Sequence, residues 1–466
     1  MKQLADRLSH AASASPFWAE FRHHRRETRL LQVQRGLVRQ AKSSVSGGLG
    51  IRVLVNGAWG FSSTSDLSVK SIEKALKQAA DCAKFISELK KTGVGKLPEV
   101  RLARGEFQLE GYDSLKAMSL EEKLDAVIKA EAATRKQSNT IQSATCAYSE
   151  IFEDKIVITT DGAHALSRLA RNEIRFSAIA SKKGEMAEGS HSVGRTGPWQ
   201  CLFSEESLQQ MSEETGQLAC DLLSAPRVPG GAATLILSPA VVGLLSHEAI
   251  GHTVEADFVL SGSVAAGKMG QMVASPMVSL YDSGTVAGLS NAGGALLVDD
   301  EGVATQSTKI IDNGKLSSYL HNRESAALYG VAPTGNARAW LYYNEPLIRM
   351  RNTYIAPGTQ SLDEIIASTK DGYLVDCPQG GQADATGEFM FAAQRVVRIE
   401  NGKRTNMYRG ATISGQAFEV LRTVDAISRE FKLDLGAGYC GKSQPAKVDA
   451  GGPYLRCRAT IGGIQS

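Results

Sequence analysis

The stretch ATLILSPAVVGLLSHEAIGHTVEAD, from Ala233 to Asp257, decides how the chain is organised. Its apolar run over 234–237 predicts a short strand, and Ser238 followed by Pro239 is typical of the start of a helix. Serine offers a side-chain oxygen to free backbone N–H groups, and proline at the first helical position gives up only an N–H that has no partner in the helix. We therefore predict a strand that leads directly into a helix.

The predicted helix carries His247, Glu248 and His252 in the order HEAIGH. Two imidazoles and a neighbouring carboxylate are the groups with which zinc hydrolases hold their ion and take a proton from water. Histidines four residues apart lie about 40° apart around a regular helix, whereas a spacing of five places them about 140° apart. A one-residue π-bulge, or an unwinding of the helix near Gly251, would bring both to one ion. The alternative is two unrelated histidines on a buried helix.

Composition and charge are those of an ordinary globular protein. Of the 466 residues, 42% are hydrophobic and 22% are charged, which suffices for a substantial core. The formal net charge of +3 is small for this length, so we expect no nucleic-acid partner. The run FRHHRRETR, from Phe21 to Arg29, is the most basic in the chain, and without a second basic cluster it is interpreted as a solvent-exposed face.

The first residues, MKQLADRLSHAASA, lack the apolar core of a signal peptide, and no run of about 18 apolar residues follows. We therefore expect no membrane span and a cytoplasmic protein. The cysteines are scattered without C-x-x-C pairs, which favours reduced thiols over a disulfide framework. They are Cys82, Cys146, Cys201, Cys220, Cys377, Cys440 and Cys457.

A Pro/Gly-rich break, SAPRVPGGAA over 224–233, divides the chain. It predicts an N-terminal domain over 1–225 that shapes or covers the site, and a C-terminal catalytic domain over 226–466 that the metal-binding helix opens. Turn dipeptides ending in glycine predict β-hairpins at 56–57, 161–162, 183–184, 313–314 and 401–402. Apolar periodicity and capping signals predict helices at 67–89, from Ser119 onward, and at 204–223, 362–369 and 415–431. Hairpins interrupted by single helices, without a βαβ alternation, predict an α+β fold of antiparallel sheets with flanking helices.

A catalytic zinc site normally has three protein ligands and one water molecule, so a third ligand is needed beside the two histidines. The residues themselves leave six candidates open: Cys440, His321, Cys377, Cys457, Glu255 and Asp257. Cys440 lies in LGAGYCGKSQP, where flanking glycines allow the backbone to bring a thiolate close to an ion. Glu255, three residues after His252, is expected either to orient a metal ligand through a hydrogen bond or to pair with a nearby basic residue.

The segment around Cys440 also matches a nucleotide-binding pattern. GAGYCGKS, over 436–443, satisfies G-x-x-x-x-G-K-[ST] letter for letter. A working P-loop must pass its phosphates to a helix that begins at the Lys-Ser pair. Pro445 and the run AGGP at 450–453 prevent a helix of useful length there, so nucleotide binding is disfavoured.

Several further motifs follow one another in a consistent order. They are GLGIRVLVNGAWGFSST in the N-terminal half, then SHEAIGHTVEAD, DDEGV at 299–303, YLHNRESA at 319–326, PTGNAR at 333–338, GGQADATGEFMF at 380–391 and GYCGKSQP at 438–445. In these motifs the chain resembles the TldD/PmbA family of metallopeptidases. The resemblance implies that Cys440 is the third zinc ligand. It also implies cleavage of unfolded or flexible peptides, and a dimer formed either with a second copy or with a PmbA-type subunit that lacks the metal motif.

Together, motifs and resemblance predict a zinc-dependent peptidase with one ion per active subunit. His247, His252 and Cys440 would hold the ion, and Glu248 would act as the general base. Candidate substrate or oxyanion contacts are His321, Asn336 and Arg338. The alternative from another class is a non-catalytic protein that modulates DNA gyrase or toxin–antitoxin systems through protein interaction. The two hypotheses differ in whether the carboxylate of Glu248 is required.

Overall fold

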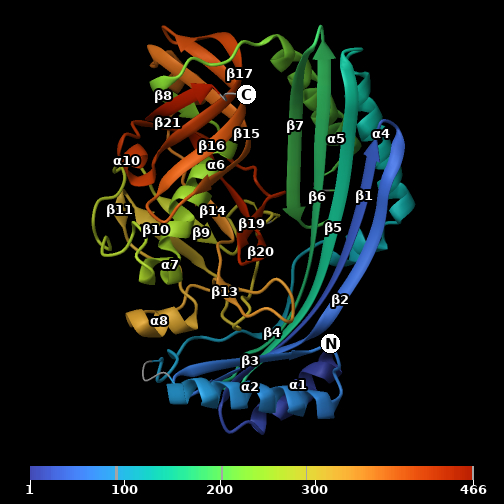
Figure 1. Ribbon diagram of the computed structural model, residues 1–466, viewed down its shortest axis with the longest axis vertical. Coiled ribbons are helices and arrows are strands. Elements are labelled where there is room, and N and C mark those ends of the chain that lie inside the picture. The colour runs from blue at the N-terminus through green and yellow to red at the C-terminus, as the bar shows by residue number, and fades with distance from the viewer. Residues whose placement is uncertain (90–92, 201–202, 290, 464–466) are drawn as a thin grey trace.

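The structure is a computed structural model that describes residues 1–89, 93–200, 203–289 and 291–463. Two large sheets dominate it, and helices flank both of them (Figure 1). The α+β fold predicted from the sequence is confirmed. The last strand of the first sheet ends at Thr196 and the second sheet begins at Gly231, so the predicted boundary at 225/226 lies in the connection between the two sheets.

The N-terminal half contains two groups of three consecutive strands, with helices before, between and after them. Its helices and strands are α1 (Lys2–Ser13), β1 (Trp18–Gln34), β2 (Leu37–Val55), β3 (Ala58–Thr64), α2 (Val69–Leu89), β4 (Arg104–Gln108), α3 (Tyr112–Ala117), α4 (Leu120–Lys136), β5 (Ile141–Thr159), β6 (His164–Lys182), β7 (Glu185–Thr196) and α5 (Glu205–Ser224). The predicted helices over 67–89, from Ser119 and over 204–223 are confirmed. Ser119 caps α4 in a reciprocal capping box with Glu122.

The described residues of this half form a seven-stranded sheet in the order β3-β2-β1-β5-β6-β4, with β7 paired to β6. Neighbouring strands are antiparallel, except that β4 runs parallel to β6. Asn56 and Gly57 both have positive φ and make the predicted tight turn between β2 and β3. Helices α1 and α2 pack on one end of the sheet, and α4 and α5 on the other (Figure 1).

The C-terminal half is richer in short elements. They are β8 (Gly231–Leu237), α6 (Pro239–Leu244), η1 (Leu245–Gly251), η2 (His252–Val254), α7 (Ala256–Leu260), β9 (Leu280–Ser283), β10 (Ser307–Asp312), β11 (Lys315–Leu316), α8 (Arg323–Tyr329), β12 (Ala337–Arg338), β13 (Leu347–Ile348), β14 (Asn352–Ile355), α9 (Leu362–Ala367), β15 (Asp371–Ala383), β16 (Glu388–Glu400), β17 (Lys403–Gln416), α10 (Ala417–Arg422), β18 (Ala426–Leu433), β19 (Tyr439–Lys442), β20 (Gln444–Lys447) and β21 (Asp449–Gly463). Among all the helices described, none is long and apolar enough to cross a membrane.

The second sheet closes on itself. Strand β8 pairs with β15 on one side and with β21 on the other, so β21, β17, β16, β15 and β8 form a ring. Side chains of these strands, among them Phe391, Ile413 and Leu455, share one apolar core with α6 and η1. Burial of this kind stabilises a structure by about 25 cal/mol per Å² of apolar surface removed from water. The helix that carries the two histidines is therefore anchored in the main core of the C-terminal half.

One predicted helix is only partly correct. The sequence predicted a helix over 415–431, but α10 ends at Arg422 and the chain continues as strand β18. Strand β18 pairs antiparallel with β21, and Ile427 and Leu433 are buried. Tertiary pairing of the backbone with a neighbouring strand outweighs the local helical periodicity, which is a weak preference on its own.

The basic run on β1 is not solvent-exposed, and that interpretation was wrong. Five of its polar side chains are buried, and three of them, Arg22, His24 and Arg26, lie on the face of β1 that the C-terminal half covers. Arg26 lies 2.6 Å from a carboxylate oxygen of Glu153 and stacks on the ring of Trp340, 3.5 Å from the ring centroid. His24 contacts the same carboxylate at 2.9 Å, and burial is the main cause that lowers the pKa of this imidazole to about 3. The run forms part of the interface between the two halves.

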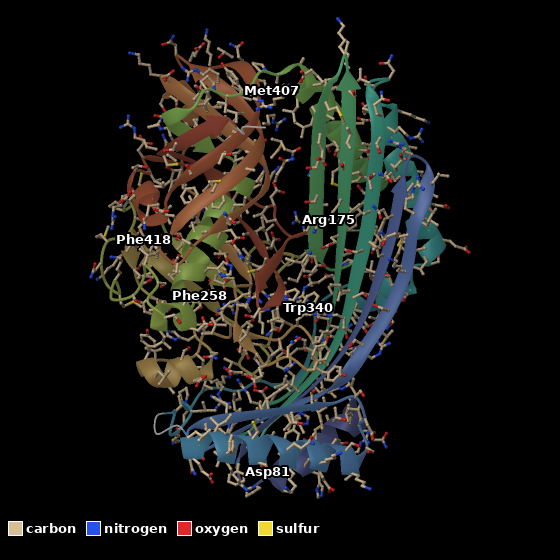
Figure 2. The ribbon with its side chains drawn as sticks, in the orientation of Figure 1. Asp81, Arg175, Phe258, Trp340, Met407 and Phe418 are labelled. Carbon is tan, nitrogen blue, oxygen red and sulfur yellow. The ribbon has the colours of Figure 1, made fainter. Side chains whose placement is uncertain are left out.

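Further ion pairs cross the same interface. Lys155 of β5 lies 2.9 Å from Asp300, and Arg52 of β2 lies 2.5 Å from Glu301. Asp300 and Glu301 belong to the motif DDEGV, so this motif binds the first sheet to the C-terminal half. Figure 2 shows Arg175 and Trp340 where the first sheet faces the C-terminal half, and the Arg175 guanidinium donates to the carbonyl of Ala437. Buried carboxylates paired in this way hold the two sheets in one orientation.

Candidate metal centre

The strand and helix predicted from the opening stretch are present as β8 and α6. Ser238 is the N-cap residue and Pro239 begins the helix, as predicted, but the serine side chain makes no capping hydrogen bond. The helix continues without a break into η1, a π-helical turn that contains His247 and Glu248. Of the two distortions that the spacing allowed, the structure contains the π-type one.

The π-helical turn explains how histidines five residues apart share one side. The backbone N–H of His252 donates to the carbonyl of His247, which is the i→i+5 hydrogen bond of a π-helix. The centroids of the two imidazole rings lie 5.2 Å apart, with an angle of 82° between the ring planes. Gly251 lies directly before His252, and a Cβ atom there would come within 1.9 Å of the Met350 sulfur. A glycine is therefore required for close packing at this position.

Cys440 completes a cluster of three ligand atoms. It lies on β19, in a hairpin with β20, and its Sγ atom is 3.1 Å from Nε2 of His252. Ligand atoms of His247, His252 and Cys440 all lie within 4.8 Å of one another. Neighbouring ligands of a tetrahedral zinc ion are separated by about 3.5 Å, given bond lengths of about 2.0–2.3 Å. Small side-chain adjustments would bring the three atoms to this separation.

The chemistry of the three donors fits a zinc ion. Both ring nitrogens of His247 are buried and have no hydrogen-bond partner among the described residues. Buried polar atoms without a partner are costly, and a metal ion would satisfy one of them. Two imidazoles and a thiolate form a donor set that suits zinc, with one position left for water or substrate.

The environment of Cys440 also favours the deprotonated sulfur that a metal needs. Burial by itself raises the pKa of a thiol, but the imidazoles of His247 and His252 lower the pKa of Cys440 to about 4. Cys377 and Cys457 were the other cysteines considered as ligands, and burial raises the pKa of each to about 12. The six cysteines in the described part of the chain are free thiols, and Cys201 lies outside it.

Glu248 and Glu255 approach His252 from different sides. The carboxylate of Glu248 lies 3.7 Å from Nε2 of His252, and its side chain keeps 25% of its surface exposed. It is therefore open to substrate while close to the ligand cluster. Glu255 is fully buried and contacts Nδ1 of His252 at 2.9 Å. Burial would lower the pKa of His252, but Glu255 and the Cys440 sulfur raise it to about 10.

Arg349 holds the hairpin that carries Cys440, and sequence reasoning missed it. Its guanidinium is fully buried and donates to the carbonyl of Cys440 at 2.7 Å and to that of Gln444 at 2.5 Å. Asn336 supports Arg349 in turn: its side-chain amide donates to the Arg349 carbonyl at 2.9 Å and to Asp282 at 2.8 Å. The segment IRMR over 348–351 places two arginines in a short apolar stretch. That pattern was the signal in the sequence that could have identified Arg349 as a buried residue.

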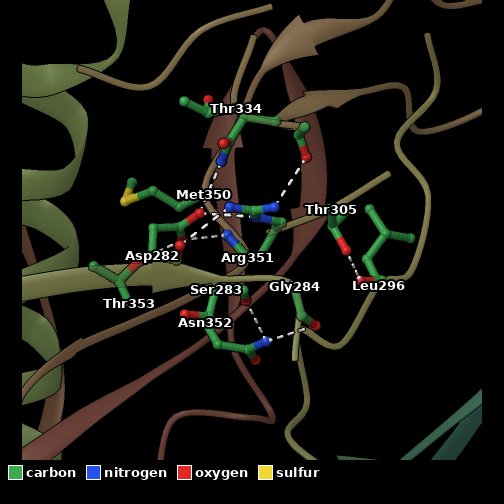
Figure 3. Close-up of polar contacts among 12 residues, drawn as sticks. Asp282, Ser283, Gly284, Leu296, Thr305, Thr334, Met350, Arg351, Asn352 and Thr353 are labelled. Atoms are coloured by element: carbon green, nitrogen blue, oxygen red, sulfur yellow. Dashed lines mark hydrogen bonds and ion pairs between the residues drawn. The ribbon is translucent and has the colours of Figure 1, made fainter. Parts of the chain in front are cut away.

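A second buried arginine lies beside the first. Arg351 and Asp282 are both fully buried, and Nε of Arg351 lies 2.8 Å from a carboxylate oxygen of Asp282 (Figure 3). The same carboxylate accepts from the backbone N–H of Arg351 and from the hydroxyl of Thr353. Both oxygens of Asp282 are thus satisfied within a strand pair, β9 with β14, that lies beside the ligand-bearing elements.

The three predicted substrate contacts make their hydrogen bonds within the fold. His321 is buried, its Nδ1 lies 3.1 Å from the hydroxyl of Ser325, and burial lowers its pKa to about 4. Arg338 donates to the carbonyls of Met350 and Lys447, each at 2.6 Å. The side-chain amide of Asn336 donates to Asp282 and to the carbonyl of Arg349. The structure does not bring them into the ligand cluster. Their contact with substrate stays a prediction.

The nucleotide-binding pattern at 436–443 does not form a P-loop. Lys442 ends strand β19, Ser443 has positive φ at the turn, and β20 begins at Gln444. No helix starts at the Lys-Ser pair in this described segment, so phosphates would find no helix N-terminus. The helix that a nucleotide site of this kind requires is therefore missing from this segment.

The ligand cluster is that of a metal-binding protein, and comparison with known families identifies the class as a metallopeptidase. Three family models match in chain order: PmbA/TldA metallopeptidase domain 1 at residues 19–83, the central domain at 113–223 and the C-terminal domain at 230–463. The chain belongs to the PmbA/TldD family. Its first two domains share the seven-stranded sheet, and the third contains the ring of strands and the ligand cluster.

Individual relatives match along nearly the whole chain. A metalloprotease of Methanocaldococcus jannaschii is 32% identical over 95% of this chain and 96% of its own length. A zinc metalloprotease TldD homolog of Saccharolobus solfataricus is 30% identical over 89% of both chains. Among solved structures, TldE from Thermococcus kodakarensis has the same fold, with a TM-score of 0.80, 20% identity, and 99% of this chain and 100% of that chain covered.

Proposed function

We propose that this chain is a zinc-dependent peptidase in which His247, His252 and Cys440 hold the ion. The observation that carries the proposal is the convergence of three ligand atoms within 4.8 Å of one another, from a π-helical turn and a distant hairpin. The printed names of the relatives, metalloprotease and zinc metalloprotease, support it.

Glu248 has the position of a general base. A zinc ion bound here would polarise a scissile carbonyl and acidify a water molecule. The carboxylate of Glu248 lies at the exposed side of the cluster and next to His252, where it can accept the proton of the attacking water. The same carboxylate then gives that proton to the amine nitrogen that leaves. His252 is kept in a fixed orientation by Glu255, so the ligand cannot turn away from the cluster.

The proposed substrates are unfolded or flexible peptides. The proposed assembly is a dimer, either of two copies or with a PmbA-type subunit. A chain that carries HEAIGH together with Cys440 would be the active subunit of such a dimer.

The metal and the general base can be tested separately. We expect purified wild type to contain about one zinc per chain, and His252→Ala and Cys440→Ala to lose it. Glu248→Gln should keep its zinc and lower peptide cleavage by about 10²- to 10⁴-fold, the usual contribution of a general base. Glu419→Gln, an exposed carboxylate on α10, is the matched control and should cleave as wild type does. Metal-free wild type, or full cleavage by Glu248→Gln, would contradict the proposal.

The alternative of a non-catalytic modulator predicts the opposite result for Glu248. A Thermotoga maritima protein named as a candidate modulator of a DNA gyrase has the same fold, with a TM-score of 0.78. At 22% identity this similarity shows a shared fold and not a shared function. An effect on gyrase that persists in Glu248→Gln would favour this alternative.

A further inference from the structure

Lys442, the lysine of the P-loop-like pattern at 436–443, contacts the segment that follows the metal-binding helix. Lys442 follows Cys440 by two residues, and its side chain crosses from the β19–β20 hairpin to the end of the metal-binding helix. Its ammonium lies 3.0 Å from Glu255, 2.8 Å from Asp257 and 3.1 Å from the carbonyl oxygen of Ile348. The side chain is 9% exposed, so this ammonium is largely removed from water.

The contact with Glu255 connects Lys442 to a metal ligand. One oxygen of Glu255, Oε2, receives both the Lys442 ammonium at 3.0 Å and Nδ1 of His252 at 2.9 Å. The other oxygen is buried and has no hydrogen-bond partner among the described residues. The orientation of the carboxylate is therefore set by these two contacts. Since Nδ1 of His252 is fixed in this way, its Nε2 is directed at the sulfur of Cys440.

These contacts close a circuit of four residues. Cys440 and Lys442 stand on the same strand, His252 and Glu255 on the same helical segment, and the two segments meet twice: sulfur to imidazole and ammonium to carboxylate. A strand and a helix end joined at two points cannot shift past each other without breaking one contact.

We propose that Lys442 is a positioning residue for the metal centre: through Glu255 it orients His252, and it holds the Cys440 hairpin at the distance that ligation requires. The inference rests on the proposed metal site. The contacts of Lys442 also argue against a role in binding phosphate. An ammonium has three N–H donors, and all three have acceptors in Glu255, Asp257 and Ile348.

The test measures metal affinity and ligand geometry rather than cleavage. Zinc affinity is obtained by competition with a chromophoric chelator, and geometry from the visible absorption of the cobalt(II) form, which reports thiolate ligation. Lys442→Met should weaken zinc binding by about 10- to 100-fold, the usual effect of losing a partner behind a metal ligand, and should alter the cobalt spectrum. Lys442→Arg, which keeps the charge, should recover part of the affinity.

Two further variants separate positioning from a general loss of stability. Asp257→Asn removes a partner of Lys442 that is 41% exposed, and should change affinity by less than about 5-fold. Glu255→Gln should weaken binding as Lys442→Met does, and the double variant should be no weaker than the worse single one, because both changes break one connection. Thermal midpoints of the metal-free proteins identify any variant that fails to fold.

The outcomes distinguish this inference from the function it rests on. If wild type binds neither zinc nor cobalt, the proposed function fails. If wild type binds both and Lys442→Met matches it in affinity and spectrum, the positioning role is overturned while the peptidase proposal stands. Multiplicative losses in the double variant would also overturn it, since Lys442 and Glu255 would then act separately.

Discussion

The sulfur of Cys440 lies 3.1 Å from Nε2 of His252, although the two residues are 188 positions apart in the chain. One stands on a short hairpin and the other at the end of a π-helical turn, and neither element can place the ligand alone. The contact depends on the buried guanidinium of Arg349 and on the ammonium of Lys442. The metal centre is consequently a property of the assembled C-terminal half.

Zinc should stabilise the wild-type fold through Cys440. A ligand that binds only the folded state stabilises it by about 2.7 kcal/mol at a concentration 100 times its dissociation constant. We expect added zinc to raise the thermal midpoint of wild type and to leave that of Cys440→Ser unchanged. The matched control is Cys457→Ser, a buried thiol outside the cluster, which should keep the zinc-dependent rise. Equal rises in both variants would argue against ligation by Cys440.

Gly251 and Met350 should be coupled. Gly251→Ala would force its Cβ against the buried sulfur of Met350, which costs about 1–3 kcal/mol for an overpacked core. Met350→Ala should cost about 2–5 kcal/mol by leaving a cavity. In the double variant the new methyl group has room, so we expect its loss of thermal stability to be clearly smaller than the sum of the two single losses. Strict additivity would mean that the two side chains do not meet.

His321 should make the fold sensitive to mild acid. Burial lowers its pKa to about 4, below the value of about 6.5 in an unfolded chain. Between these values the unfolded state binds a proton that the folded state does not, so stability falls as the pH falls. From pH 6.5 to 5 the loss that this group contributes is about 1.6 kcal/mol, which His321→Gln should remove.

The measurement is the thermal midpoint at pH 6.5 and pH 5 for wild type and the variant. His10→Gln, which changes an exposed histidine on α1, is the control and should keep the full sensitivity of wild type. An unchanged pH dependence in His321→Gln would show that the imidazole is not kept neutral by the fold.

Removing only one partner of the buried pair of Arg351 and Asp282 should strongly lower the free energy of unfolding. Arg351→Met leaves the Asp282 carboxylate buried without its counter-charge, which typically costs about 3–5 kcal/mol (Figure 3). The comparison is Arg398→Met on β16, whose partner Asp371 is 67% exposed, and where the loss should be below about 1 kcal/mol. Similar losses in thermal midpoint for the two variants would contradict the difference in burial.

Local signals in the sequence predicted those parts of the fold that short segments decide. Asn-Gly pairs marked the turns at 56–57, 313–314 and 401–402, where the asparagines have positive φ. The Ser119 capping box began α4, and the five-residue spacing of HEAIGH predicted either a π-bulge or an unwinding of the helix, of which the structure contains the π-helical form. Each of these signals involves residues within a few positions of one another, so sterics and hydrogen bonding along the chain suffice.

Tertiary structure decided everything that depends on a distant partner. Arg26 of β1 is buried because the C-terminal half covers it with Trp340, and residues 426–433 are a strand because β21 offers its backbone. The chain alone left six candidates for the third ligand, and only packing brought Cys440 to His252. Sequence fixes which groups are available, but burial and the approach of remote segments set their charge state and geometry, because both depend on the dielectric and the partners that folding provides.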